Sequence, residues 1–185
     1  MSARIIRADD MKPQPWKNGM GVTREVLRFP ADADGNHFMW RISIADVNSA
    51  APFSTFPGID RQIVLLEGEG FTMTLDGDQT HSLTTPRQPF AFAGEAQVDV
   101  TMAGGVTRDF NLMVRRAQAS GHIDVIDGPG SPVMPADAVL VFLAQGTADT
   151  PQGTLAAGDA WQPDRNPLVL HEGAIALVAR VRTTI

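Results

Sequence analysis

The sequence predicts an all-β fold built from two related halves, and three observations support this. Short apolar runs recur along the chain, 17 glycines and 13 prolines punctuate them, and helical periodicity is scarce. This spacing of short strands and turn residues is typical of β-sandwiches and β-barrels. The best helical candidate is a single turn near Ala8–Met11, which Pro13 and Pro15 cut short.

The expected strands follow from alternating or continuous apolar runs bounded by glycine, proline or aspartate. In the first half they are Val22–Phe29, Met39–Ala45, Gln62–Leu66, Phe71–Leu75, Phe90–Ala93, Val98–Met102 and Phe110–Arg115. In the second half they are His122–Ile126, Val139–Ala144, Gly153–Leu155, Leu168–Leu170 and Ile175–Arg182.

A segment rich in proline and glycine, Gly128–Ala138, is interpreted as a connector between the two halves. The stretches "IVLLEGEG…TLDGDQTHSL" and "LVFLAQGTADTPQGTLAAGDAW" share an outline of apolar strand, glycine, short strand and Gly-Asp corner. This weak internal repeat predicts two related β units. We expect residues 1–118 to carry a ligand pocket and residues 119–185 to be a structural partner, packed together as one compact unit.

Composition excludes several classes of function. A chain of 185 residues can bury a substantial core, and 43% hydrophobic with 19% charged residues is ordinary for a globular protein. The net charge of −6 argues against nucleic acid as a partner. No cysteine is present, which excludes disulfides, thiolate nucleophiles and cysteine-ligated zinc. No apolar run has the length of a signal peptide or membrane span, so we expect a cytoplasmic protein without a membrane partner.

The hairpin within "FPGIDRQIVLLEGEGFTMTLDGD" looks like the first half of a cupin motif. Metal-binding cupins hold an ion with two histidines and a glutamate from this motif, followed by a later histidine, because these ligands must converge from adjacent strands. With Gly68 as the closing glycine, the glutamate position falls on Arg61. The histidine positions fall on Ser54 and Phe56, or on Thr55 and Pro57, and the later one on Gln97.

The four histidines of the chain, His37, His81, His122 and His171, are far apart in sequence and near turns or strand ends. We therefore expect them to be surface residues, and we expect no metal and no other cofactor. Arg61 changes the chemistry of the motif, because a guanidinium stays protonated and binds carboxylates through two parallel hydrogen bonds. It predicts an anionic ligand. The alternative is a surface ion pair of Arg61 with Asp60 or Glu67.

Four stretches, "PWKNGMGVTREV", "WRISIADVNSAAPFSTFPGIDRQ", "LLEGEG" and "DFNLMVRR", occur in this order. Together they closely resemble the HutD/Ves family of metal-free bicupins, over most of residues 4–116 and more loosely to the end. The resemblance implies a cupin-type barrel or sandwich fold. It also implies an accessory or regulatory role in bacterial histidine utilisation, with small acids such as urocanate or N-formylglutamate as ligands. One departure is Met20, where many members have a glycine.

Alternation within these stretches predicts the faces of three strands. Thr23 and Glu25 are expected to point inward, with Lys17 or Arg61 as a partner for the glutamate. Asn111 is expected to line the pocket if its face of the strand turns that way. The candidate ligand-binding residues are Trp16, Lys17, Asn18, Thr23, Glu25, Ser43, Phe56, Arg61 and Asn111.

Plainer interpretations stay open for several of these residues. Trp16 is more readily a packing or loop-anchoring residue than a stacking platform. Lys17 and Asn18 are equally turn residues, and Thr23 with Glu25 is equally a buried pair. Phe53 and Phe56 either cover the mouth of the pocket or fill the core.

Three classes of function remain. The favoured one is a carboxylate-binding regulatory protein without catalysis. The second is a metal-independent hydrolase or isomerase of a small acid, with Glu25 as base and Lys17 or Arg61 stabilising an oxyanion. The third is an interaction protein, and exposed strand edges are compatible with a homodimer.

Overall fold

The computed structural model describes residues 3–184 and shows an all-β chain that divides into two units. One unit combines the segment ending at Met11 with Gly121–Arg182, and the other spans Lys12–Ser120 together with Thr183 and Thr184. The two halves expected from the sequence are residues 1–118 and 119–185. Residues 3–11, however, belong with the C-terminal unit, where β1 (Arg4–Ile6) pairs with β15 (Ala160–Gln162).

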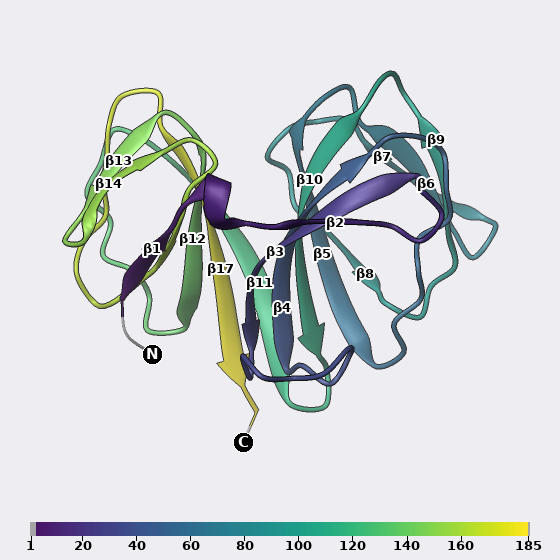
Figure 1. Cartoon of the computed structure of the whole chain (residues 1–185), viewed down its shortest axis with the longest axis horizontal. Coiled ribbons are helices and arrows are strands. Elements are labelled where there is room, and N and C mark those ends of the chain that lie inside the picture. Colours follow the sequence, from purple (N-terminus) through teal and green to yellow (C-terminus); the bar gives the residue numbers. More distant parts are fainter. Residues whose placement is uncertain (1–2, 185) are drawn as a thin grey trace. The chain divides into compact units, whose positions relative to one another are not determined.

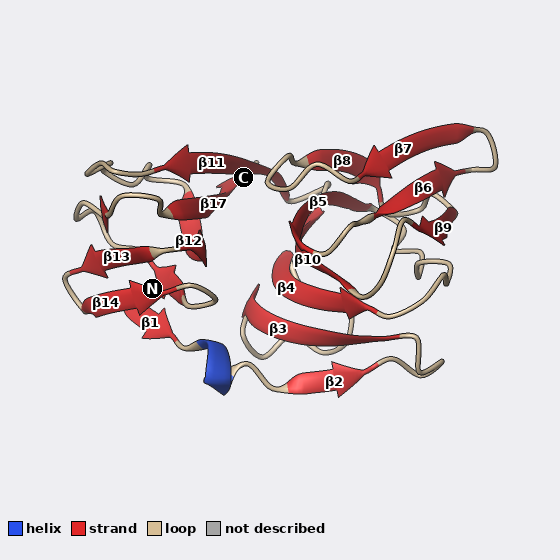
Figure 2. Cartoon of the chain, turned by 90° about the horizontal axis from the view of Figure 1, so that it is seen from above, coloured by secondary structure: helices blue, strands red, loops and turns tan. Residues whose placement is uncertain are grey.

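The larger sheet of the Lys12–Ser120 unit has six strands in the order β2-β3-β4-β10-β5-β8 (Figure 2). Its strands are antiparallel neighbours. Their bounds are β2 Pro13–Pro15, β3 Gly21–Phe29, β4 Trp40–Val47, β5 Ile59–Glu67, β8 Phe90–Ala93 and β10 Thr107–Arg115.

A second sheet of this unit has three strands in the order β7-β6-β9, with bounds β6 Phe71–Leu75, β7 Gln79–Leu83 and β9 Val98–Met102. Apolar side chains from both sheets, among them Ile63, Leu65, Phe71 and Val98, form one buried cluster. This places the hydrophobic core between the two sheets, as in a sandwich.

The other unit repeats this plan with a five-stranded and a three-stranded sheet (Figure 1). The five-stranded order is β1-β15-β12-β17-β11 and the three-stranded order is β14-β13-β16. The remaining bounds are β11 Ala119–Asp127, β12 Ala138–Gln145, β13 Thr147–Thr150, β14 Gly153–Ala156, β16 Val169–Leu170 and β17 Ile175–Thr183. Its core gathers around Trp161, which is fully buried.

Two details of the sequence interpretation change. The expected helical turn is a short 3₁₀ helix, Ala8–Asp10. The segment Gly128–Ala138 does not join the two units, because it runs from β11 to β12 within one five-stranded sheet. Bridges from Gly130 and Val133 to the region of β16 hold this segment against its own unit.

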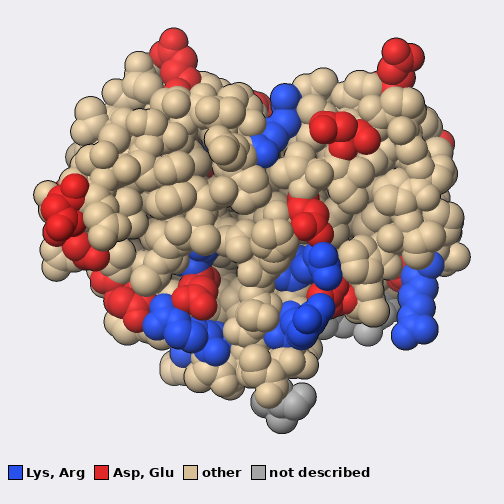
Figure 3. Space-filling model, turned by 180° about the vertical axis from the view of Figure 1, so that it is seen from behind, with Lys and Arg blue, Asp and Glu red and all other residues tan. Residues whose placement is uncertain are grey.

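Charged side chains of both signs lie side by side on the face seen in Figure 3. Ion pairs between such side chains occur in the structure; Arg180, for example, pairs with both Asp124 and Asp137. None of the helical segments in residues 3–184 has the length and apolar character needed to cross a membrane.

Candidate functional site

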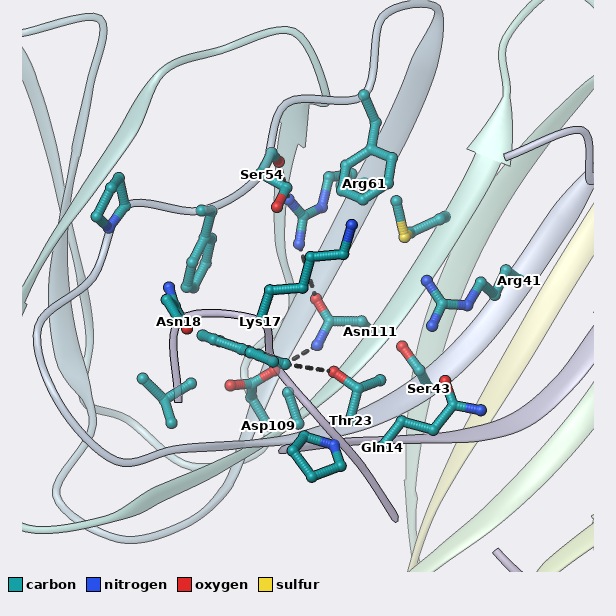
Figure 4. Close-up of a pocket in the computed structure, with 18 residues that line it drawn as sticks. Gln14, Lys17, Asn18, Thr23, Arg41, Ser43, Ser54, Arg61, Asp109 and Asn111 are labelled. Atoms are coloured by element: carbon teal, nitrogen blue, oxygen red, sulfur yellow. Dashed lines mark hydrogen bonds between the residues drawn. The ribbon is translucent and has the colours of Figure 1, made fainter. Parts of the chain in front are cut away.

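A cavity of about 540 Å³ opens on one face of the six-stranded sheet, a size ordinary for small-ligand sites (Figure 4). Its polar and charged lining consists of Gln14, Lys17, Asn18, Thr23, Arg41, Ser43, Ser54, Arg61, Asp109 and Asn111. Its apolar lining consists of Pro15, Trp16, Ala45, Val47, Pro52, Phe53, Phe56 and Met113. All of these residues belong to the Lys12–Ser120 unit.

The register of the strands explains why residues distant in sequence share this cavity. Asn111 on β10 lies directly opposite Ser43 on β4, and Asp109 lies opposite Ala45. On the other side of β10, Arg61 lies opposite Met113. Because side chains of directly opposite residues point to the same face of a sheet, the three strands present one continuous polar surface.

Arg61 is the central cation of this surface. Its residue exposure is 8%, and its guanidinium carbon lies 4.8–5.5 Å from the ring centroids of Phe53, Phe56 and Phe92. Burial lowers the pKa of Arg61 to about 10, against the attraction of Asp109, so the side chain is still charged at neutral pH. The aromatic rings favour a cation there through their negative faces.

The hydrogen bonds of Arg61 are few and long for a buried guanidinium. One Nη donates to the Ser54 carbonyl at 3.5 Å and the other to Asn111 Oδ1 at 3.3 Å. Its Nε is buried and has no hydrogen-bond partner among residues 3–184. The guanidinium therefore retains donor capacity beyond these two contacts.

Asn111 connects Arg61 to a buried carboxyl group. Its Oδ1 accepts from Arg61 while its Nδ2 donates to Asp109 Oδ1, giving a chain that runs Arg61–Asn111–Asp109 (Figure 4). Burial raises the pKa of Asp109 to about 7, although the hydrogen bond from Asn111 and the charge of Arg61 act in the opposite direction. Asp109 Oδ2 is buried without a hydrogen-bond partner among the described residues.

The loop after β2 supplies another side of the cavity. Trp16 is anchored by its backbone N–H to the Gly21 carbonyl at 2.9 Å and by its indole N–H to Thr23 Oγ1 at 2.7 Å. Asn18 Oδ1 accepts the backbone N–H of Met20 at 3.0 Å. Both side chains thus have the anchoring contacts of the plainer interpretation while also lining the cavity.

Lys17 in the same loop differs from these neighbours, because it has no hydrogen bond or ion pair with any of residues 3–184. In Figure 4 its side chain extends toward the end of the cavity where Arg61 and Ser54 lie. It adds a second, exposed cation to that end.

Glu25 does not line the cavity, although it shares the inward face of the sheet with Ser43, which lies opposite. Its carboxylate binds Arg28 and Arg41, not Lys17 or Arg61 as expected. Partial burial disfavours the charged form, but the hydrogen bonds and charges of the two arginines outweigh it and lower the pKa of Glu25. An ionised carboxylate held in this way is a poor general base.

The other expected residues line the cavity: Trp16, Lys17, Asn18, Thr23, Ser43, Phe56, Arg61 and Asn111. The expected alternative for Arg61, a surface ion pair, is wrong, because Asp60 pairs with Arg116 and Glu67 with Arg108. Sequence reasoning overlooked Asp109 as a site residue. The signal was available, since Asp109 alternates with Asn111 and Met113 on one face of "DFNLMVRR".

The donor set of the cavity suits an anion better than a metal ion. Its charged lining is Lys17, Arg41, Arg61 and Asp109. Within residues 3–184, no three His, Asp or Glu side chains are grouped so that they could hold a metal ion.

Comparison with known proteins gives the family. The HutD family model matches residues 8–180. An uncharacterised 21.2 kDa protein in the hutC 3′ region of Pseudomonas putida is 39% identical over 76% of this chain and 73% of its own length. Protein Ves of Cronobacter sakazakii is also 39% identical, over 64% of this chain and 65% of its own length.

A solved structure of HutD from Pseudomonas fluorescens SBW25, described as a formate condition, has a TM-score of 0.83 at 32% identity over 100% of both chains. Solved structures of much lower identity share the cupin-type fold, here as two-sheet sandwiches. The family is linked to the histidine utilisation region. The chain belongs to the HutD family.

Proposed function

We propose that this chain is a cytoplasmic protein that binds a small carboxylate and acts as an accessory or regulatory factor in histidine utilisation. Urocanate and N-formylglutamate are the candidate ligands, since both combine a carboxylate with a planar or amide-bearing body. The family's link to the histidine utilisation region supports the pathway. The charge and the lining of the cavity support a carboxylate as the ligand.

The observation that carries the proposal is Arg61. A guanidinium removed from water needs an anion or several strong acceptors to offset its lost hydration. Arg61 has two long contacts to neutral oxygens and forms no ion pair with a carboxylate among residues 3–184. A ligand carboxylate would take the place of those missing acceptors in the bidentate geometry that guanidinium favours.

The rest of the lining suits the body of such a ligand. Trp16, Phe53 and Phe56 provide flat apolar walls, while Asn111, Ser43 and Thr23 provide hydrogen-bonding groups on the sheet. Small-molecule sites combine apolar walls with polar groups that fix the orientation of the ligand, and this lining provides both. Lys17 at the opening would add attraction for an anion as it approaches.

A thermal-shift and calorimetric titration with urocanate, N-formylglutamate, formate, glutamate and histidine tests the proposal. At about 100 times its dissociation constant, a ligand should add roughly 2.7 kcal/mol, which is a shift of several degrees in Tm. Arg61→Ala should abolish the shift. Arg61→Lys should weaken it, because lysine keeps the charge but lacks the two parallel N–H donors of a guanidinium.

Arg116→Ala is the matched control, since Arg116 lies in the same unit but pairs with Asp60 and Glu95 on the surface. It should bind as the wild type does. If a folded wild-type sample shows no shift with any of the five compounds, the histidine-pathway ligand is ruled out and an interaction role takes precedence.

A second candidate function, a metal-independent hydrolase or isomerase, is favoured by Asp109. A buried carboxyl with a pKa of about 7 and an unpartnered oxygen at the cavity has the properties of a general acid–base group. Incubating each bound compound with the protein and following its NMR spectrum tests this. Turnover lost in Asp109→Asn would establish the enzyme, and unchanged spectra over long incubation would leave binding as the function.

A further inference from the structure

We propose that the cavity binds its anion together with one proton, and that Asp109 holds this proton. The inference rests on the proposed function, because it concerns how the same cavity accommodates a carboxylate. Asp109 Oδ1 is occupied by Asn111, whereas Oδ2 is buried and unpartnered among residues 3–184. The carboxyl group and the guanidinium of Arg61 line one cavity and are linked through a single amide.

No cation among residues 3–184 contacts Asp109 directly, so the attraction of Arg61 offsets its burial only in part. On β5, Arg61 reaches it through Asn111 and not by direct contact. On β4, Arg41 is held by Glu25, and Asp46 adds a like charge. On β3, Arg24 pairs with Asp46 and Arg28 pairs with Glu25. In the β2–β3 loop, the charged residue that lines the cavity is Lys17.

An anion in this cavity changes the balance further toward the protonated acid. A ligand carboxylate on Arg61 places a negative charge near Asp109, and a neighbouring like charge raises the pKa of a carboxyl group. The same anion also neutralises part of the positive charge of Arg61, which in the free protein lowers the pKa of Asp109. Binding and proton uptake are therefore coupled, with the proton taken from solvent.

The coupling narrows the class of ligand. Protonated Asp109 carries an O–H donor at Oδ2, the oxygen that the protein leaves unpartnered. The best ligand then has a carboxylate for Arg61 and, a few bonds away, a neutral hydrogen-bond acceptor for Asp109. Carboxylic acids that also bear an amide, formamide or imidazole acceptor meet both requirements, whereas a plain aliphatic acid of the same charge meets only the first.

Linkage gives the sign and size of the effect. Burial places the pKa of Asp109 in the free protein at about 7. Below that pH the proton is already present and affinity is independent of pH. Above it the proton must be taken up, so the dissociation constant rises up to tenfold for each pH unit.

Isothermal titration calorimetry of N-formylglutamate tests the proposal, because its carboxylates titrate well below the range of interest, at about pH 4. Titrations at pH 6, 7, 8 and 9 are run in pairs of buffers with different ionisation enthalpies, so that the heat reports the protons exchanged. We expect close to one proton taken up per ligand at pH 8 and about one tenth of that at pH 6. The dissociation constant should rise close to tenfold between pH 8 and 9.

Asp109→Asn distinguishes proton uptake from a merely structural role. Asparagine keeps the acceptor for Asn111 and presents an N–H donor where Oδ2 stood, which mimics the protonated acid. The variant should take up no proton and should bind at pH 9 at least tenfold more tightly than the wild type. Asp60→Asn, which alters an exposed carboxylate of the same unit, should retain the wild-type pH dependence.

The outcomes separate this inference from the proposed function. Binding with a dissociation constant that does not vary from pH 6 to 9 and no proton uptake overturns the inference and leaves carboxylate binding in place. Weaker binding by Asp109→Asn at pH 9 also overturns it, because Asp109 would then act as an ionised group. No binding of N-formylglutamate, urocanate or formate at pH 6 overturns both.

Discussion

Replacing Asp109 by asparagine should stabilise the folded protein, and the gain should grow as the pH rises from about 4 to 7. The pKa of Asp109 is raised by burial from its ordinary value of 3.8 to about 7. An acid whose pKa is higher in the folded state contributes its full stability below pH 3.8, and that contribution is lost as the pH rises through 7. Asparagine removes the ionisation and keeps the hydrogen bond from Asn111.

The size of the gain in stability follows from the shift in the pKa of Asp109. About three pKa units at roughly 1.4 kcal/mol each make the ionised side chain about 4 kcal/mol less favourable in the fold than in the unfolded chain. The free energy of unfolding of the variant should thus exceed that of the wild type by about 4 kcal/mol above pH 8, by about 2 kcal/mol near pH 5.5 and by almost nothing at pH 3. The pKa of about 7 already includes the attraction between Arg61 and ionised Asp109, so no separate correction is needed for it.

Urea unfolding of both proteins at pH 4, 5.5, 7 and 8.5, followed by circular dichroism, measures the difference in free energy of unfolding. Asp60→Asn serves as the control because the Asp60 side chain is 54% exposed and pairs at the surface, so its difference from wild type should stay within about 1 kcal/mol. If the difference between Asp109→Asn and wild type is the same at pH 4 and pH 8.5, or if the variant is less stable at pH 8.5, the reasoning about the buried carboxyl is wrong.

Three further substitutions test the supports of the fold and site. Glu25→Gln should cost about 1–2 kcal/mol at pH 7 by loosening Arg41, and the cost should vanish in urea titrations well below pH 4, where wild-type Glu25 is itself protonated. Asp159→Ala should cost about 2–3 kcal/mol in the same assay, because its carboxylate accepts two backbone N–H groups and an arginine while only 8% exposed. Gly21→Ala should destabilise by about 1–3 kcal/mol and shift the fluorescence of Trp16, since the added methyl would lie 2.8 Å from the indole ring. A Gly21→Ala spectrum identical to wild type would show that the loop is not seated as described.

The sequence predicted best those strands whose apolar residues end at an unmistakable turn. For three strands, the expected and observed bounds are identical: Phe71–Leu75, Phe90–Ala93 and Val98–Met102. The sequence interpretation missed five strands, β1, β2, β7, β13 and β15, and two of them, β2 and β7, share one reason. Pro13–Pro15 and Gln79–Leu83 are mostly polar or proline-containing and exposed, and both lie at sheet edges. Such strands are defined by hydrogen bonds to one neighbour, which a sequence pattern does not reveal.

For the site, Thr23, Ser43 and Asn111 all line the cavity. Alternation along each strand predicted an inward face for Thr23 and left the faces of Ser43 and Asn111 open. It was not enough for Glu25, which has the predicted face but turns its carboxylate toward Arg28 and Arg41. Which arginine reaches a given carboxylate depends on the register of neighbouring strands, and register is a tertiary property. Alternation puts Asp109 on the same face as Asn111, but its burial and the hydrogen bond from Asn111 depend on the neighbouring strands and cannot be derived from spacing.

The indirect link between Arg61 and Asp109 also bears on the proposed binding of an anion. Had the two side chains formed a direct bidentate ion pair, the internal carboxylate would occupy the donors that a ligand needs. Asn111 instead holds them one amide apart, so each is stabilised too little by the other to offset its burial. The protein thereby keeps a guanidinium that gains most from an external anion, and a carboxyl group that can give up its charge when the anion arrives. A metal ion offers a fixed positive charge, whereas this pair offers a charge balance that responds to both ligand and pH.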